Sequence, residues 1–127
     1  MAEFATAEAA HARATELIDE RRFRDAVEPA GAACRLRPDW ADAWWNYGVA
    51  LKHAGRWADC LEACDRAIAL APENSEGARW NAGIAATAVG DWDRARAAWA
   101  GCGIPVPPGE GPLEMAIGYA GIRISGT

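Results

Sequence analysis

The residue types best suited to chemistry in this 127-residue sequence are its four cysteines and two histidines. Cys60 and Cys64 are four residues apart, so a helix would bring both thiols to one face. Two thiols are too few for a structural zinc site, which takes four ligands. His11 and His53 fall on a different face of the expected helices. We therefore interpret the cysteines, which include Cys34 and Cys102, as buried core thiols of a cytoplasmic protein, and we expect no metal and no other cofactor.

Motifs for catalysis are not recognisable. Gly109 and Gly111 stand among prolines, which is typical of a linker and not of a phosphate-binding turn before a helix. A nucleophilic pair of Cys60 with His53 would require opposite faces of two helices to meet. Most acidic residues fall on solvated faces. The sequence therefore predicts a protein that is not an enzyme and has no catalytic residues.

Composition and charge exclude several classes of partner. Thirteen Lys and Arg residues against eighteen Asp and Glu residues give a net charge of −5, which disfavours nucleic acid as the main partner. The longest apolar runs are far shorter than the roughly 20 residues that span a bilayer. The acidic N-terminal segment lacks the apolar stretch of a signal peptide. We expect a cytoplasmic domain that binds no nucleic acid and no membrane.

The stretch from residue 41 to residue 72 contains two amphipathic helical patterns that meet at a turn around Gly55. In the first pattern Trp44, Tyr47, Gly48 and Leu51 form one stripe, because residues three, four and seven apart share a helix face. A single pair of helices cannot bury both of its apolar stripes. The pair therefore needs neighbours of the same kind.

The same pattern recurs along the chain. Phe23, Trp57 and Trp92 are spaced by 34 and then 35 residues. The same spacings separate three further pairs of landmarks: Pro38 and Pro72, Gly48 and Gly83, Gly55 and Gly90. This period predicts three helical hairpins, at about residues 7–40, 41–74 and 75–104.

A helix–turn–helix unit of about 34 residues resembles the tetratricopeptide repeat. The family pattern is met in the middle repeat by Trp44, Tyr47, Gly48, Leu51, Cys60, Cys64 and Pro72. The resemblance implies an all-α fold, an α–α superhelix or solenoid of three such hairpins over residues 1–104. In this pattern the small residues mark places where two helix backbones approach closely.

Local signals predict the helix ends. We expect the first two helices over about residues 5–20 and 24–36, and the fourth over 57–70. The third, fifth and sixth helices are expected to end at about residues 53, 89 and 100. Asp39 is expected to cap the third helix, Asn74 or Ser75 the fifth, and Asp91 the sixth. Pro29 lacks an N–H donor, so it predicts a kink in the second helix or a late start.

Residues 105–127 form a different segment. A run rich in proline and glycine predicts an extended tail, and the alternation from Leu113 to Ile124 predicts strand. Because an isolated hairpin is marginal in water, the tail must pack on the last helix, on a second copy in a homodimer, or on a further domain. The chain looks cut short at Thr127, and similar bacterial repeat proteins often continue there.

The resemblance also implies the kind of partner. In this family the first helix of each hairpin lines an inner groove that holds a peptide or a helix of another protein. By periodicity, the groove residues are His11, Thr15, Trp45, Asn46, Val49, Lys52, His53, Trp80, Asn81, Ile84 and Thr87. Trp45 and Trp80 stand about 100° from the core stripe and are expected to be binding anchors, unless they pack between repeats or under the tail. Basic residues of the family's clamp for a C-terminal carboxylate are missing, so we expect no such clamp.

Three functions remain in order of preference. The first is a non-catalytic protein–protein interaction module, or scaffold, that binds a peptide. The second is an N-terminal docking or regulatory domain of a larger bacterial protein. The third is a structural piece that self-associates through its tail.

Overall fold

A computed structural model describes residues 4–107, 109 and 111–112 of the chain. Its regular elements are six α-helices and one short 3₁₀ helix: α1 (Ala7–Asp19), α2 (Phe23–Leu36), α3 (Ala41–His53), α4 (Trp57–Leu70), η1 (Pro72–Asn74), α5 (Glu76–Val89) and α6 (Trp92–Gly101). None of the residues described is in a strand. The predicted all-α fold is confirmed, and the observed helix ends lie within two residues of the predicted ones.

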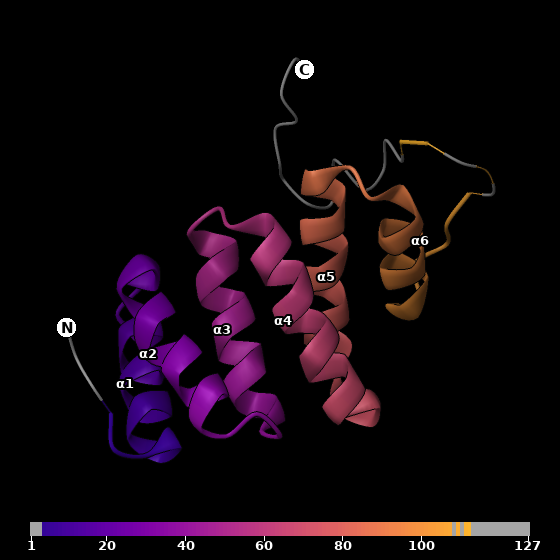
Figure 1. Ribbon diagram of the computed structural model, residues 1–127. Helices are drawn as coiled ribbons and strands as arrows, with labels where there is room; N and C mark the ends of the chain where they lie inside the picture. The colour runs from indigo at the N-terminus through magenta and orange to yellow at the C-terminus, as the bar shows by residue number, and fades with distance from the viewer. Residues whose placement is uncertain (1–3, 108, 110, 113–127) are drawn as a thin grey trace.

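The helices form three hairpins in a row, α1 with α2, α3 with α4, and α5 with α6 (Figure 1). Each helix packs on the next one along the chain, and α3 also contacts both α1 and α5. The ends of the row, α1 and α6, lie far apart, so the array is open and not a closed bundle. This is the predicted solenoid of hairpins, in which each unit covers the apolar face of its neighbour.

The turn inside each hairpin has one geometry. Arg21, Gly55 and Gly90 occupy equivalent places with φ values of 63°, 76° and 78°. After each of them, the next N–H donates to a carbonyl five residues back, over 2.8–2.9 Å. Such a bond satisfies a carbonyl at the helix end and requires the left-handed conformation. The period seen in the sequence is therefore also a period of backbone conformation.

Small residues allow the two helices of a hairpin to approach. A Cβ atom at Gly48 would lie 3.2 Å from the sulfur of Cys64, and one at Gly83 would lie 2.7–2.9 Å from three ring atoms of Trp99. Trp99 itself is fully buried. The expectation that these glycines mark close backbone approaches is confirmed.

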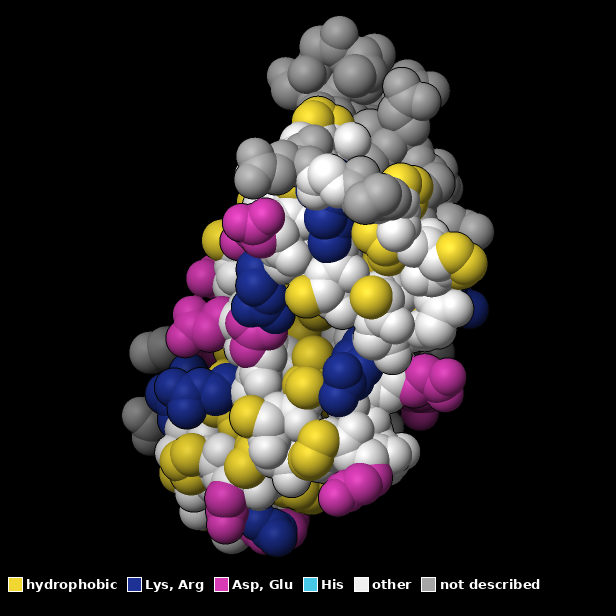
Figure 2. Space-filling view, turned by 90° about the vertical axis from the view of Figure 1, so that its right-hand side faces the viewer, with side chains coloured by type: hydrophobic (Ala, Val, Ile, Leu, Met, Phe, Trp, Pro, Cys, Tyr) yellow, Lys and Arg dark blue, Asp and Glu magenta, His cyan; other side chains and the backbone are white. Residues whose placement is uncertain are grey.

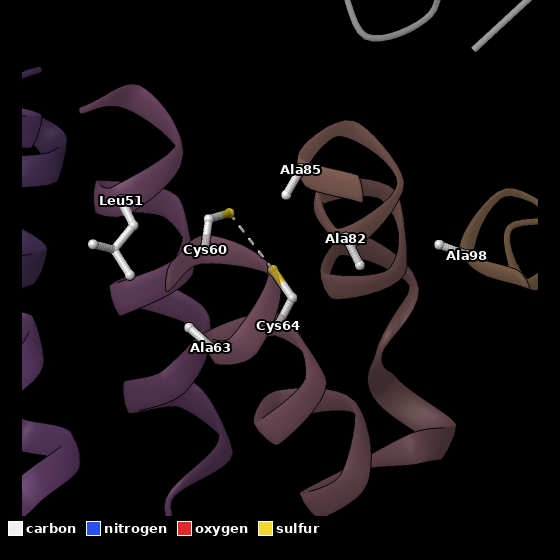
Figure 3. Packing of buried hydrophobic residues seen from close by; sticks show 7 residues of the cluster. All are labelled: Leu51, Cys60, Ala63, Cys64, Ala82, Ala85 and Ala98. Atoms are coloured by element: carbon white, nitrogen blue, oxygen red, sulfur yellow. Dashed lines mark hydrogen bonds between the residues drawn. The ribbon is translucent and has the colours of Figure 1, made fainter. Parts of the chain in front are cut away.

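Thiols occupy the centre of the array between α4 and its neighbours (Figure 3). The Cys60 thiol donates to the carbonyl of Gly48 over 3.3 Å, and its sulfur lies 4.0 Å from that of Cys64. Burial raises the pKa of the Cys34 thiol to about 12, so this group stays protonated. Cys34, Cys60 and Cys64 are core thiols as predicted, whereas Cys102 is only partly buried.

The local predictions have mixed outcomes. α2 is continuous from Phe23 through Pro29 to Leu36, so the alternative of a late start is wrong, and the alternative of a kink stays a prediction. Asp39 does not cap α3, because Trp40 holds the N-cap position and no side chain bonds to the first turn. The prediction for Asp91 is confirmed, since its carboxylate accepts from the N–H of Arg94 over 3.2 Å. Ser75 is at the N-cap position of α5, but its hydroxyl donates to the carbonyl of Pro72 instead.

The start of the tail lies against the third hairpin. Ile104 and Val106 pack on the cluster that contains Ile84 and Trp99. The strand predicted from Leu113 to Ile124, and with it the tail-mediated homodimer, lies outside the described residues.

The surface at the α6 end of the row carries interspersed charges (Figure 2). Basic and acidic side chains alternate on this face, with hydrophobic side chains dispersed among them. No helix within the described residues is long and apolar enough to cross a membrane.

Candidate partner-binding surface

The first helices of the three hairpins, α1, α3 and α5, lie next to one another and place three rings at equivalent positions. His11 packs on Trp40, with ring centroids 4.3 Å apart. Trp45 is 37% exposed and Trp80 is 36% exposed. The Trp80 ring meets Trp99 edge to face at 4.9 Å, so it is partly held by the third hairpin.

Trp45 bridges the second and third hairpins. A Cβ atom at Gly77, in the first turn of α5, would lie 2.7 Å from the Trp45 ring. The indole therefore fits only because residue 77 has no side chain. Its position is fixed by packing, and more than a third of its surface remains open to solvent. A rigid and exposed aromatic residue of this kind is typical of interaction sites.

The two asparagines connect neighbouring repeats. The Asn46 amide of α3 donates to the Thr15 hydroxyl of α1 over 2.9 Å and approaches Nδ1 of His11 at 3.4 Å. The Asn81 side-chain carbonyl of α5 accepts from the Lys52 ammonium of α3 over 3.1 Å. The sequence placed both asparagines in the groove, and in the structure their side chains bond between hairpins.

The predicted groove residues fall into two groups. The partly or largely exposed group contains His11, Thr15, Trp45, Asn46, Val49, Lys52, His53 and Trp80. The buried group contains Asn81, Ile84 and Thr87. Thr87 donates to the carbonyl of Gly83 over 2.7 Å and accepts from the Trp99 indole over 3.3 Å. Fewer of the predicted groove residues are therefore exposed on the third hairpin than on the second, because its polar groove residues are buried.

A pocket of about 360 Å³ opens beside Trp45, between α3, the end of α4 and the start of α5. Asp42 and Glu76 line it together with small residues such as Ala71 and Gly77. The groove set chosen from the sequence does not include Glu76 or Ala71. Comparing equivalent positions one period apart would have drawn attention to residue 71, because Arg37 stands there in the first repeat.

Both histidines of this surface have a pKa below the ordinary value of 6.5, which favours the neutral ring. Burial lowers the pKa of His11 below 6.5, although the nearby Asp42 carboxylate acts in the opposite direction. Burial, Lys52 and Arg21 lower the pKa of His53, whose ring stacks on Phe23 at 3.8 Å. Near Trp45 the charge therefore comes mainly from carboxylates.

Groups of three or more metal-ligating side chains do not converge anywhere in the described part of the chain.

The fold defines an α-helical repeat protein whose first helices share one surface. The family model of the tetratricopeptide repeat matches residues 41–74, which comprise α3, α4 and η1. This match confirms the resemblance of the middle hairpin to a tetratricopeptide repeat that was inferred from the sequence. Repeats of this family are protein–protein interaction modules. No curated protein matches the chain.

Proposed function

We propose that the array binds a peptide segment of a partner protein along the surface formed by α1, α3 and α5, without a catalytic step. The observation that carries this proposal is the Trp45 indole, which is packed against Gly77 and yet 37% exposed. A large aromatic side chain held in place at the surface loses little conformational freedom on binding, which is why tryptophan is enriched among binding hot spots.

The surroundings of Trp45 support the proposal. Hydrogen bonds from Asn46 to α1 and from Lys52 to α5 tie the three first helices into one continuous surface. Residues His11, Thr15, Val49 and His53 extend this surface, and Trp80 continues it onto the third hairpin. We place the protein in the cytoplasm, where the reduced thiols of its core are stable.

Selection from a random peptide library on the 127-residue chain tests the proposal. The best peptides are synthesised and their affinities measured by fluorescence anisotropy. Because a hot-spot tryptophan contributes about 2 kcal/mol or more, Trp45→Ala should weaken binding roughly 30-fold. Because the indole also packs on Gly77, the melting temperature should decrease, so both affinities are measured at a temperature at which the variant is folded.

Leu36→Ala is the matched control. Leu36 is 49% exposed on α2, outside the proposed surface, so its truncation should leave the affinity unchanged. Selected peptides that bind Trp45→Ala as tightly as the parent chain would refute the proposal.

A further inference from the structure

The two junctions between neighbouring hairpins, which we call the first and second gap, have the same backbone conformation at the residue that ends the preceding helix. Arg37 and Ala71 are 34 residues apart, and they are the C-cap residues of α2 and α4. Both have a φ value of −143°, with ψ values of 78° and 68°, and each donates its N–H to a carbonyl four residues back. A side chain at either position therefore leaves the backbone in the same direction relative to its repeat.

In the first gap this side chain is a cation. The Arg37 guanidinium lies over the Trp40 ring, 4.6 Å from the ring centroid. It also pairs with the Glu8 carboxylate of α1 over 3.4 Å. The junction between the first and second hairpins thus places an arginine between an aromatic ring and a carboxylate.

In the second gap the arginine is replaced by Ala71, and the pocket of about 360 Å³ opens there. Asp42 lines this pocket and is the equivalent of Glu8 one period later. The aromatic surface comes from Trp45, and a second carboxylate comes from Glu76. None of the described residues that line the pocket is Lys, Arg or His. The second gap therefore also has acidic and aromatic side chains, although Asn74 stands at the position of Trp40 and the aromatic ring comes from Trp45 instead, and it lacks the cation of the first gap.

We propose that this pocket receives an arginine side chain of the partner peptide, in the place that Arg37 takes between the first two hairpins. The inference rests on the proposed function and specifies the ligand of the same surface. Walls that include Ala41 and Ala67 suit the methylene stem. The guanidinium then lies against the Trp45 ring and forms charge-assisted hydrogen bonds with the carboxylates of Asp42 and Glu76.

An anionic ligand is the alternative, because α3 and α5 both begin at the pocket and helix N-termini attract negative charge. Asp42 and Glu76 lie in the first turns of these two helices and already supply that negative charge. A further anion would be repelled by both carboxylates, so the pocket favours a cation.

The test is an NMR titration of the 127-residue chain with three small probes, observed at the Trp45 indole N–H. The probes are the N-acetyl methylamides of arginine, of citrulline and of glutamate. Citrulline has nearly the shape of arginine but no charge. The arginine probe should bind at least about fivefold more tightly than the citrulline probe, as expected for a cation–π contact supported by carboxylates.

Three variants assign the effect to the pocket. The double variant Asp42→Asn with Glu76→Gln should reduce the affinity for the arginine probe to that for citrulline. Ala71→Arg should block the pocket with the protein's own guanidinium and abolish the arginine-specific shift. Glu73→Gln is the matched control, because Glu73 is an exposed carboxylate of η1 that does not line the pocket.

Two outcomes overturn the inference: equal affinity for arginine and citrulline, or tighter binding of the glutamate probe. Persistence of the arginine preference in the double variant or in Ala71→Arg would also overturn it. Library peptides that need Trp45 but not arginine would leave the proposed function standing without this inference. If the arginine probe binds but no selected peptide depends on Trp45, the pocket binds arginine and the proposed peptide-binding function fails.

Discussion

At the scale of single residues, the packing of the array depends on glycines at places where a side chain would collide with a neighbouring ring. Gly83 faces the fully buried ring of Trp99, and Gly77 faces Trp45. The repeat pattern predicted the role of Gly83, because the family requires a small residue there. It could not predict the role of Gly77, since the match between this glycine and the Trp45 ring belongs to this chain and not to the pattern.

Gly83→Ala should destabilise the fold by roughly 1–3 kcal/mol, because the new Cβ would come within 2.7 Å of a ring that has no room to move. Chemical denaturation measures the change in the free energy of unfolding. Gly101→Ala is the control: its Cβ would meet only the flexible Arg79 side chain, at 3.0 Å or more, so it should cost little. Equal effects of the two substitutions would argue against this explanation.

Arg21 is a residue in an unfavourable backbone conformation. Its φ of 63° matches those of Gly55 and Gly90, yet it carries a Cβ atom. Arg21→Gly should raise the free energy of unfolding by about 0.5–1 kcal/mol, because relief of the left-handed strain exceeds the added entropy of the unfolded chain. Arg21→Ala keeps the Cβ and should give no such gain. Thermal unfolding of both variants distinguishes the two cases, and a gain in Arg21→Ala would contradict the argument.

At the scale of helices, length and period were predictable, and capping was predictable only in part. The apolar stripes of α3 and α4 determine where those helices lie, because burial of the stripe outweighs local preferences. Capping depends on the rotamer and on competing acceptors. Asp91 bonds to its helix, Asp39 lies one residue too early, and Ser75 turns to Pro72 and Arg79. Pro29 likewise is accommodated inside α2, where neighbouring helices hold the segment.

Asp91→Ala should cost about 1 kcal/mol of stability, because the N–H of Arg94 loses its side-chain acceptor. The effect should be a lower melting temperature. Asp93→Ala removes a carboxylate from the same first turn and should lose only a few tenths of a kcal/mol of interaction with the helix dipole. If Asp93→Ala is the more damaging change, the hydrogen bond of Asp91 is not what stabilises the start of α6.

At the scale of the whole molecule, the spacing of like residues predicted the row of hairpins and the side formed by the first helices. The pocket beside Trp45 was beyond that reasoning, because it arises where the repeats differ. Arg37 and Ala71 share a backbone conformation and differ in side chain, and the space that results is visible only in the folded structure. The pattern also could not show that Thr87 and Asn81 are buried, where Thr87 bonds to the Gly83 carbonyl and Asn81 to the partly exposed Lys52.

The surface formed by the first helices also makes stability depend on pH. Burial lowers the pKa of His11 and of His53 below their ordinary value of 6.5, with Lys52 and Arg21 adding to the effect at His53. The unfolded chain therefore binds protons at a higher pH than the folded one. Stability from these groups is complete above pH 6.5 and is lost as the pH falls through the lower pKa of the folded state.

The melting temperature should consequently decrease from about pH 7.5 to about pH 5.5, above the range in which ordinary carboxylates titrate. The double variant His11→Gln with His53→Gln should flatten this dependence, whatever its melting temperature at the higher pH. Calorimetry at several pH values measures both slopes. A melting temperature that rises on acidification, or a slope that the double variant leaves unchanged, would mean that the two rings do not resist protonation in the fold. The contacts of His53 with Phe23 and of His11 with Trp40 would then not be what keeps these rings neutral.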